Sequence, residues 1–211
     1  RSTASVNIDH TTMSTQTQKR AYRKRARAES EDETRLRITE ALMTLHETVG
    51  PARTTVSAVA ELAGVQRATV YRHFPDVEAQ VEACSSHWLS LNAPPDPSPW
   101  LATKDPDRRL RLALDEMYAW YERTAPMIEK LYRDAPLVPE IAVRMEARGA
   151  AIEQLAHQLA AGRAARGARR RRVMAAIGHA LDFRTWTSLT RTQDLSRGEA
   201  VELMSRLVAA A

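Results

Sequence analysis

The chain has 211 residues, of which 44% are apolar, and only one, Cys84, is a cysteine. A single cysteine excludes an internal disulfide and a thiolate metal cluster, and no apolar run approaches the roughly 18 residues that span a bilayer. The sequence shows no export signal, so we expect a cytoplasmic protein without a membrane partner.

The formal charge of +5 is distributed unevenly. Residues 1–30 carry +5 and residues 161–211 carry +6, whereas residues 31–90 carry −4 and residues 91–160 carry −2. A positive excess favours a polyanionic partner such as nucleic acid, but the total does not say which segment binds it.

The first 30 residues are expected to form a disordered basic arm. Residues 1–18 are mostly polar and have hardly any of the large apolar side chains that bury a core. Six basic side chains follow within residues 19–27, and these are placed to follow DNA phosphates or enter a minor groove. The alternative is a solvated tail without a partner.

Three helices are expected before residue 75. The first begins at Glu31 and ends at Gly50, because its apolar residues recur at helical spacing between these points. Two shorter helices follow near 55–63 and 66–73. Asp76 is then placed to cap a fourth helix.

The two short helices have the pattern of a helix-turn-helix. Helices that cross steeply need a small residue where they touch, a glycine at the turn, and apolar residues that face a third helix. Ala60, Gly64 and Val70 stand at these positions. The other face of the second helix is polar, so we expect it to enter a DNA major groove.

This segment resembles the TetR family of transcriptional regulators. The resemblance rests on Thr54-Thr55, on Ala-Gly-Val at 63–65, and on Thr-Val-Tyr-Arg-His-Phe-Pro at 69–75. Residues 180–189 are in addition similar to the dimerisation region of many members.

The resemblance implies an all-α protein of about nine helices. Its expected parts are a helix-turn-helix DNA-binding domain over 31–75, a linking helix over 76–92, and a helical effector-binding and dimerisation domain over 93–211. It implies a homodimer that binds a double-stranded inverted-repeat operator, most simply as a repressor released by a small-molecule effector.

The resemblance also implies the DNA contacts. Thr55 would cap the first motif helix and meet a phosphate, while Gln66 and Arg67 would face base edges. Gln66 stands where the family often has a serine and should cap poorly, and Val77 stands where it usually has a lysine. The full expected set is Thr54, Thr55, Gln66, Arg67, Thr69, Tyr71, Arg72 and His73.

In the remaining chain, a proline-rich connector over 92–99 is followed by helices that prolines begin. Pro106, Pro126 and Pro136 are the expected first-turn prolines, and Ser196 with Glu199 predicts a capping box on the last helix. The arginine-rich stretch 163–172 is expected to be a solvated loop, although a second nucleic-acid patch is the alternative. No strand pattern occurs.

Aromatic and methionine side chains of this domain are candidates for an effector pocket, although burial in an ordinary core is an equally good interpretation. Asp115, Glu116 and Glu122 would select a cationic ligand if they faced it. The candidate pocket residues are Trp100, Met117, Tyr118, Trp120, Tyr121 and Tyr132.

The last two long helices are expected to pair with their symmetry mates in a four-helix bundle. The candidate interface residues are Val173, Ile177, Leu181, Met204, Leu207 and Val208.

The residues suggest no enzyme. No nucleophile with its base, phosphate loop or metal-ligand spacing is visible, so we expect no cofactor and no metal. An effector-independent architectural DNA-binding protein is the main alternative function, and it would be favoured if the helical domain had no cavity.

Overall fold

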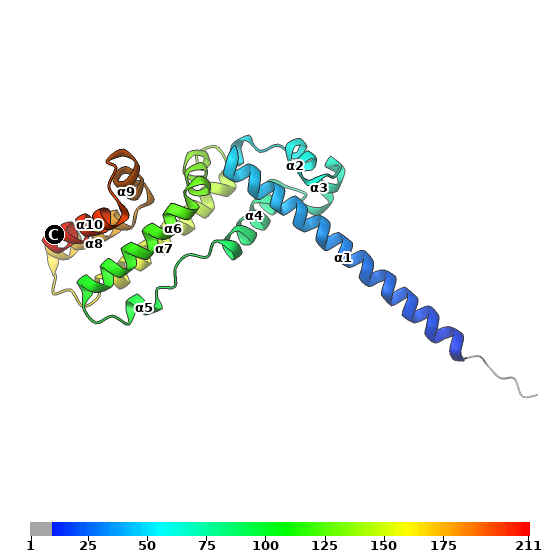
Figure 1. Cartoon of the computed structure of the whole chain (residues 1–211), viewed down its shortest axis with the longest axis horizontal. Helices are drawn as coiled ribbons and strands as arrows, with labels where there is room; N and C mark the ends of the chain where they lie inside the picture. The colour runs from blue at the N-terminus through cyan, green and yellow to red at the C-terminus, as the bar shows by residue number, and fades with distance from the viewer. Residues whose placement is uncertain (1–9) are drawn as a thin grey trace, which may run out of the picture.

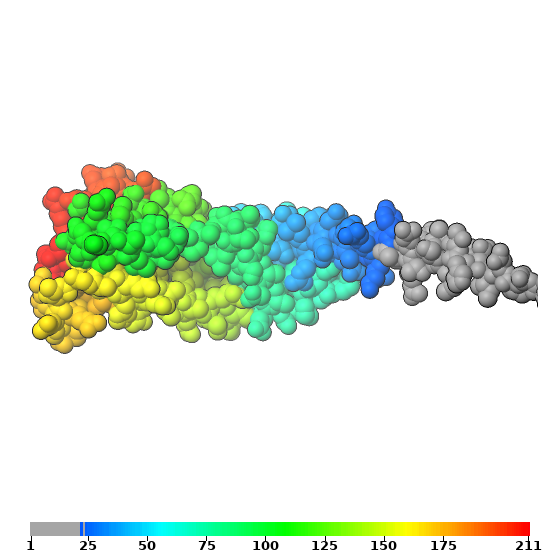
Figure 2. All heavy atoms as spheres, turned by 90° about the horizontal axis from the view of Figure 1, so that it is seen from below, coloured from blue at the N-terminus to red at the C-terminus, as the bar shows by residue number. Residues whose placement is uncertain are grey.

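The structure is a computed structural model that describes the backbone of residues 10–211 and the side chains of residue 22 and residues 24–211. The described part contains ten α-helices and no strand, which confirms the all-α prediction with one helix more than expected. Figure 1 shows α1, α2 and α3 toward one end of an elongated molecule and α8 and α10 at the other. Figure 2 shows the same elongation from a second side.

The first helix differs from the prediction. α1 (His10–Thr48) is one continuous helix of 39 residues, so the arm expected to be disordered is helical from His10 onward. Residues 1–9 of that arm lie outside the described residues. Large apolar residues are few in this segment, but extending a helix that packing has already nucleated adds a hydrogen bond for each residue fixed. This extension projects beyond the rest of the molecule (Figure 1).

The helix-turn-helix forms as predicted. α2 (Val56–Ala63) and α3 (Arg67–His73) flank Gly64, whose φ of +65° lies in the left-handed region that glycine adopts without strain. A short 3-10 turn, η1 (Pro51–Arg53), precedes them. A small core holds α1, α2 and α3 together, and it includes Ile38, Leu42, Val59, Val70 and Phe74.

The fourth helix, α4 (Val77–Leu91), begins where the sequence predicted. The Asp76 carboxylate accepts a hydrogen bond from the Ala79 amide at 2.8 Å and so caps the helix. Cys84 on α4 is buried among the apolar residues of the first domain, and this burial raises the pKa of its thiol to about 12. The thiol is therefore a packing group.

Six further helices follow α4, and most of them pack around a second, larger core. Two of the predicted starts are confirmed, since Asp105 caps the helix that begins at Pro106, and Ser196 with Glu199 forms the capping box. The helices are α5 (Ser98–Leu101), α6 (Pro106–Asp134), α7 (Pro139–Ala160), α8 (Gly167–Leu181), α9 (Phe183–Thr187) and α10 (Arg197–Ala210), with a π-helical turn, η2 (Ser188–Thr192), before α10.

Two predicted helix starts are wrong. Pro126 lies inside α6, and Pro136 lies in the turn before α7, which begins at Pro139. A proline inside a helix removes one hydrogen bond. Burial of the adjacent residues Met127 and Ile128 in the core offsets that loss.

The arginine-rich stretch is also not the loop that was expected. α8 begins at Gly167, so residues 169–172 are helical. Arg163 pairs with Asp107 at 2.7 Å, and its side chain is only 11% exposed. Only residues 161–166 connect α7 to α8, and their first arginine ties the connection to the start of α6.

Candidate DNA-binding face and ligand cavity

The polar face of α3 is open to solvent. Gln66, Arg67, Tyr71 and Arg72 are exposed, while Thr69 is half-buried. The Gln66 side chain makes no capping hydrogen bond, as its length suggested, so its amide is available to a ligand. The structure therefore brings these predicted contact residues onto one accessible surface.

The two threonines before α2 differ in their surroundings. Thr55 is exposed, and its hydroxyl oxygen accepts a hydrogen bond from the Ala58 amide at 3.2 Å, so it caps α2 as predicted. Thr54 is half-buried, and its hydroxyl donates to the Gly50 carbonyl at 2.9 Å. In the free protein Thr54 thus supports the turn that leads into the motif.

Arg35 of α1 is a basic residue of this face that the sequence analysis missed. Its guanidinium donates to the carbonyl of His73 at 2.9 Å and lies 4.3 Å from the centre of the Phe74 ring. Burial, Arg72 and Arg35 all lower the pKa of His73. Because 38 residues separate Arg35 from His73, no local pattern could have paired them.

A cavity of about 660 Å³ lies where α1, α4, α6, α7 and the proline-rich connector meet. Its walls are mainly apolar and include three of the candidate pocket residues, Trp100, Met117 and Trp120. Other lining residues include His46, Cys84, Ser85, Trp88, Leu89, Met127, Ile128, Leu131, Ile141, Arg144, Met145, Arg148, Ile152 and Leu155.

The other three candidate pocket residues lie elsewhere. Tyr121 and Tyr132 line a second hollow of about 630 Å³, to which α7 and α8 contribute most of the walls. Tyr118 lines neither hollow, because it is fully buried and its hydroxyl donates to the Ala180 carbonyl at 2.8 Å. For Tyr118 the core interpretation applies.

The three carboxylates that would have selected a cationic ligand, Asp115, Glu116 and Glu122, do not line the cavity. Arg197 of α10 pairs with Asp115 at 3.0 Å and with Glu122 at 3.2 Å, on the side of α6 that faces α10. Glu116 is exposed and lines neither hollow. Helical spacing does not say which way these carboxylates point, and packing of α10 on α6 decides it.

One ion pair joins α4 to α7 beside the cavity. The guanidinium of Arg144 on α7 binds the carboxylate of Glu82 on α4, and this hydrogen bond is the main reason that the pKa of Glu82 is lowered. The same carboxylate accepts a hydrogen bond from Ser86 at 2.9 Å. α4 is therefore tied to the wall of the cavity.

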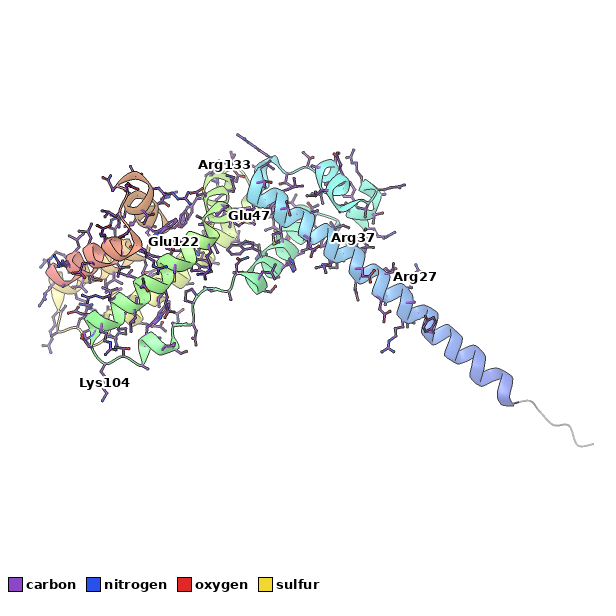
Figure 3. All side chains as sticks on the ribbon, in the orientation of Figure 1. Arg27, Arg37, Glu47, Lys104, Glu122 and Arg133 are labelled. Atoms are coloured by element: carbon purple, nitrogen blue, oxygen red, sulfur yellow. The ribbon has the colours of Figure 1, made fainter. Side chains whose placement is uncertain are left out.

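A second junction joins the end of α1 to the end of α6. Arg133 donates to the Val49 carbonyl at 2.7 Å, and Asp134, which is 1% exposed, accepts from the Ala52 amide at 3.0 Å. Figure 3 shows Arg133 at this meeting point. Hydrogen bonding to Arg133 lowers the pKa of Asp134, so the charge is held in the ionised form.

His46 lies between this junction and the cavity. It is 5% exposed, and burial lowers its pKa from 6.5 to about 4 despite the opposing charge of Asp134. The folded protein therefore binds fewer protons at this site than the unfolded chain between about pH 4 and 6.5. The free energy of unfolding is therefore not reduced by this site above about pH 6.5. It falls as the pH drops from 6.5 to 4, because the unfolded chain binds the proton that the folded protein does not bind.

We expect His46→Gln to remove this pH dependence. Wild-type protein should lose up to about 3 kcal/mol of unfolding free energy at this site between pH 6.5 and 4, and the variant should not. Urea unfolding at several pH values measures the difference. The matched control is His157→Gln, which removes an exposed histidine of α7; equal pH profiles for wild type and His46→Gln would contradict the assignment.

Most of the candidate dimer residues are buried inside the subunit. Packing among α6, α8 and α10 covers them, so they cannot form the outer face of a helix pair; they are Val173, Ile177, Leu181, Met204 and Val208. Leu207 is 51% exposed, and Leu203, which the sequence analysis did not single out, is 40% exposed one turn away on α10. The apolar surface that α10 presents to solvent thus shares only Leu207 with the predicted set.

No helix within residues 10–211 is long and apolar enough to cross a membrane. Among the described side chains, no three histidine, cysteine, aspartate or glutamate residues are grouped as metal ligands.

Residues 38–84 match the family described as bacterial regulatory proteins, tetR family. No curated protein matches the chain in sequence. Among solved structures, a putative fatty acid metabolism regulator from Clostridium perfringens is 15% identical, with a TM-score of 0.59 over 83% of this chain and 98% of the other.

Two other solved structures have similar folds. A TetR-like transcriptional regulator from a Rhodococcus species is 18% identical, with a TM-score of 0.59 over 83% of this chain and 93% of the other. A TetR transcription regulator from Haloarcula marismortui is 17% identical, with a TM-score of 0.53 over 85% of this chain and 95% of the other. At these identities the likeness concerns the fold.

Proposed function

We propose that this chain, which belongs to the TetR family of DNA-binding transcriptional regulators, is a homodimeric repressor that a small-molecule effector releases from an inverted-repeat operator. The observation that carries the proposal is the exposed polar face of α3 on a well-packed helix-turn-helix. Two such faces, related by the dimer axis, would enter successive major grooves about 34–36 Å apart.

In this proposal Gln66, Arg67 and Thr69 face base edges, because they occupy the first turn of α3 and its cap. The phosphate contacts come from both helices of the motif: Thr55 caps α2, and Tyr71 and Arg72 lie on α3. Arg35 supports the end of α3 through its hydrogen bond to the His73 carbonyl. The exposed residues Lys24, Arg25 and Arg27 of the projecting part of α1 would supply further phosphate contacts, since residues 31–90 are net acidic.

Selection of bound sequences from a random duplex pool tests the proposal. We expect an inverted repeat whose half-sites are about one helical turn apart. A selected pool without a shared sequence would favour the architectural alternative. A reporter gene placed behind the selected operator then distinguishes a repressor from an activator.

Replacing Arg67 with alanine should reduce operator affinity by about 1–3 kcal/mol for each half-site and relax the preference at one base pair. Arg72→Ala is the matched comparison, because a lost phosphate contact weakens binding to all sequences alike. It also reduces the slope of log affinity against log salt concentration by about 1 in magnitude. Fluorescence anisotropy with the operator and with its single-base variants measures both effects. Equal loss on every sequence for Arg67→Ala would exclude its role in base recognition.

The cavity between the domains supports control by an effector. Trp88 and Leu89 of α4 line it, and Glu82 of the same helix is bound to Arg144 across its rim. A ligand that binds more tightly when α4 takes a different position would favour a conformation in which the two α3 helices have another spacing. Operator affinity would then fall by at most the ratio of the ligand's affinities for the two conformations. An architectural protein needs no such cavity, so this feature favours the regulator.

A further inference from the structure

One arginine in the wall of the cavity makes no ion pair. It stands between the two hollows, and the second one, which it also lines, has Glu153 and Asp182 in its walls. Arg148 of α7 is half-buried, and its guanidinium lies 5.3 Å from the centre of the Trp120 ring and 5.5 Å from that of Tyr121. It donates to the Tyr121 hydroxyl at 3.3 Å, while its Nε is buried without a hydrogen-bond partner. Among the described side chains, none of the ion pairs includes Arg148.

All charged groups that line the cavity have the same sign. Arg144 lies one helical turn from Arg148, and no aspartate or glutamate lines the cavity. His46, the remaining titratable base, is neutral near pH 7 because burial lowers its pKa to about 4. A partly buried cation without a counter-ion is unfavourable, and an anion that binds there relieves this cost.

The cavity is long as well as apolar. Its α7 wall extends from Ile141 to Gln158, which corresponds to about 25 Å of helix. Three tryptophans, Trp88, Trp100 and Trp120, face the same space. The walls therefore suit an extended apolar tail.

We infer that the effector is a carboxylate with an extended apolar tail, and that Arg148 binds its head group. Arg148 donates hydrogen bonds to the carboxylate while the tail lies along the apolar wall of α7. Arg144 lies one helical turn from Arg148 and adds a second positive charge. Its guanidinium is bound to Glu82, so the ligand carboxylate and Glu82 would both interact with it. The inference names the ligand class of the proposed effector site and rests on that proposed function.

Decanoate, decanol and decyltrimethylammonium are matched probes for this inference, because they share a tail and differ in head-group charge. Three tryptophans line the cavity. Their fluorescence should therefore change when a probe binds, and the titration can be done on the full-length protein without DNA. We expect decanoate to bind at least about tenfold more tightly than decanol, and the cation to bind most weakly. Octanoate should bind about fifteenfold more weakly than decanoate, because two methylenes fewer are buried.

Arg148→Gln should abolish the preference for decanoate over decanol and leave decanol binding unchanged, which shows that the cavity is intact. Arg184→Gln is the matched control, because Arg184 also lies over an aromatic ring, at 4.9 Å from the centre of Tyr132, but does not line this cavity. Equal affinities for decanoate and decanol in the wild type, or an unchanged preference in Arg148→Gln, would overturn the inference. Because the titration contains no DNA, such a result would leave the operator selection and the proposed regulator unaffected.

Discussion

Replacing Gly50 with alanine is expected to destabilise the protein by about 3–5 kcal/mol. Gly50 has a φ of +97°, and a Cβ at this position would overlap both the Arg133 guanidinium and the Asp134 carboxylate. Arg133 can move aside because its side chain is long. Asp134 cannot, because it is buried and bonded to the Ala52 amide. The substitution therefore combines backbone strain with separation of a buried charge from its partners.

Gly64→Ala separates these two contributions. Gly64 also has a positive φ, +65°, but nothing lies within 4 Å of the Cβ that alanine would add. It should lose only the strain energy of about 1–2 kcal/mol. Denaturant unfolding of both variants measures the difference, and equal losses would show that the contacts with α6 at Gly50 contribute little.

The contacts at Gly50 illustrate what the sequence could not predict. The sequence marks Gly50 and Pro51 as a helix end, and the structure places a helix end there. The reason that only glycine fits comes from Arg133 and Asp134, more than 80 residues later. Local patterns predict where helices stop, but they carry no information on which distant side chain occupies the space beside the turn.

The same distinction explains the outcomes at the two candidate sites. The exposed polar face of α3 could be predicted because it depends on spacing within one short motif and on caps such as Thr55 and Asp76. The lining of the apolar cavity could be predicted only in part, because its walls come from α1, α4, α6 and α7 together. Arg148 has no sequence signature, since its lack of an ion pair and its place beside Trp120 and Tyr121 depend on the three-dimensional packing.

Substituting Leu203 and Leu207 together with glutamate is expected to lower operator affinity at least about 100-fold. Both leucines are exposed on α10, at the end of the molecule opposite α3 (Figure 1), and a pair of copies would bury them against each other. Glutamates at a symmetric interface place like charges opposite one another and separate the subunits. A monomer binds only one half-site, so its operator affinity lacks the increase that comes from binding two half-sites at once.

The control is Leu137→Glu, because Leu137 is 70% exposed in the turn between α6 and α7, far from α10 in the sequence. Light scattering should give a dimer for the wild type and for Leu137→Glu, and a monomer for the double variant. The double variant should still unfold cooperatively, because neither exposed leucine belongs to the buried core. It should lack only the concentration-dependent stabilisation that pairing gives to the wild type and to Leu137→Glu. If the double variant stays a dimer with full operator affinity, the subunits pair through another face, and the exposed stripe of α10 has no part in holding the two α3 helices at their spacing.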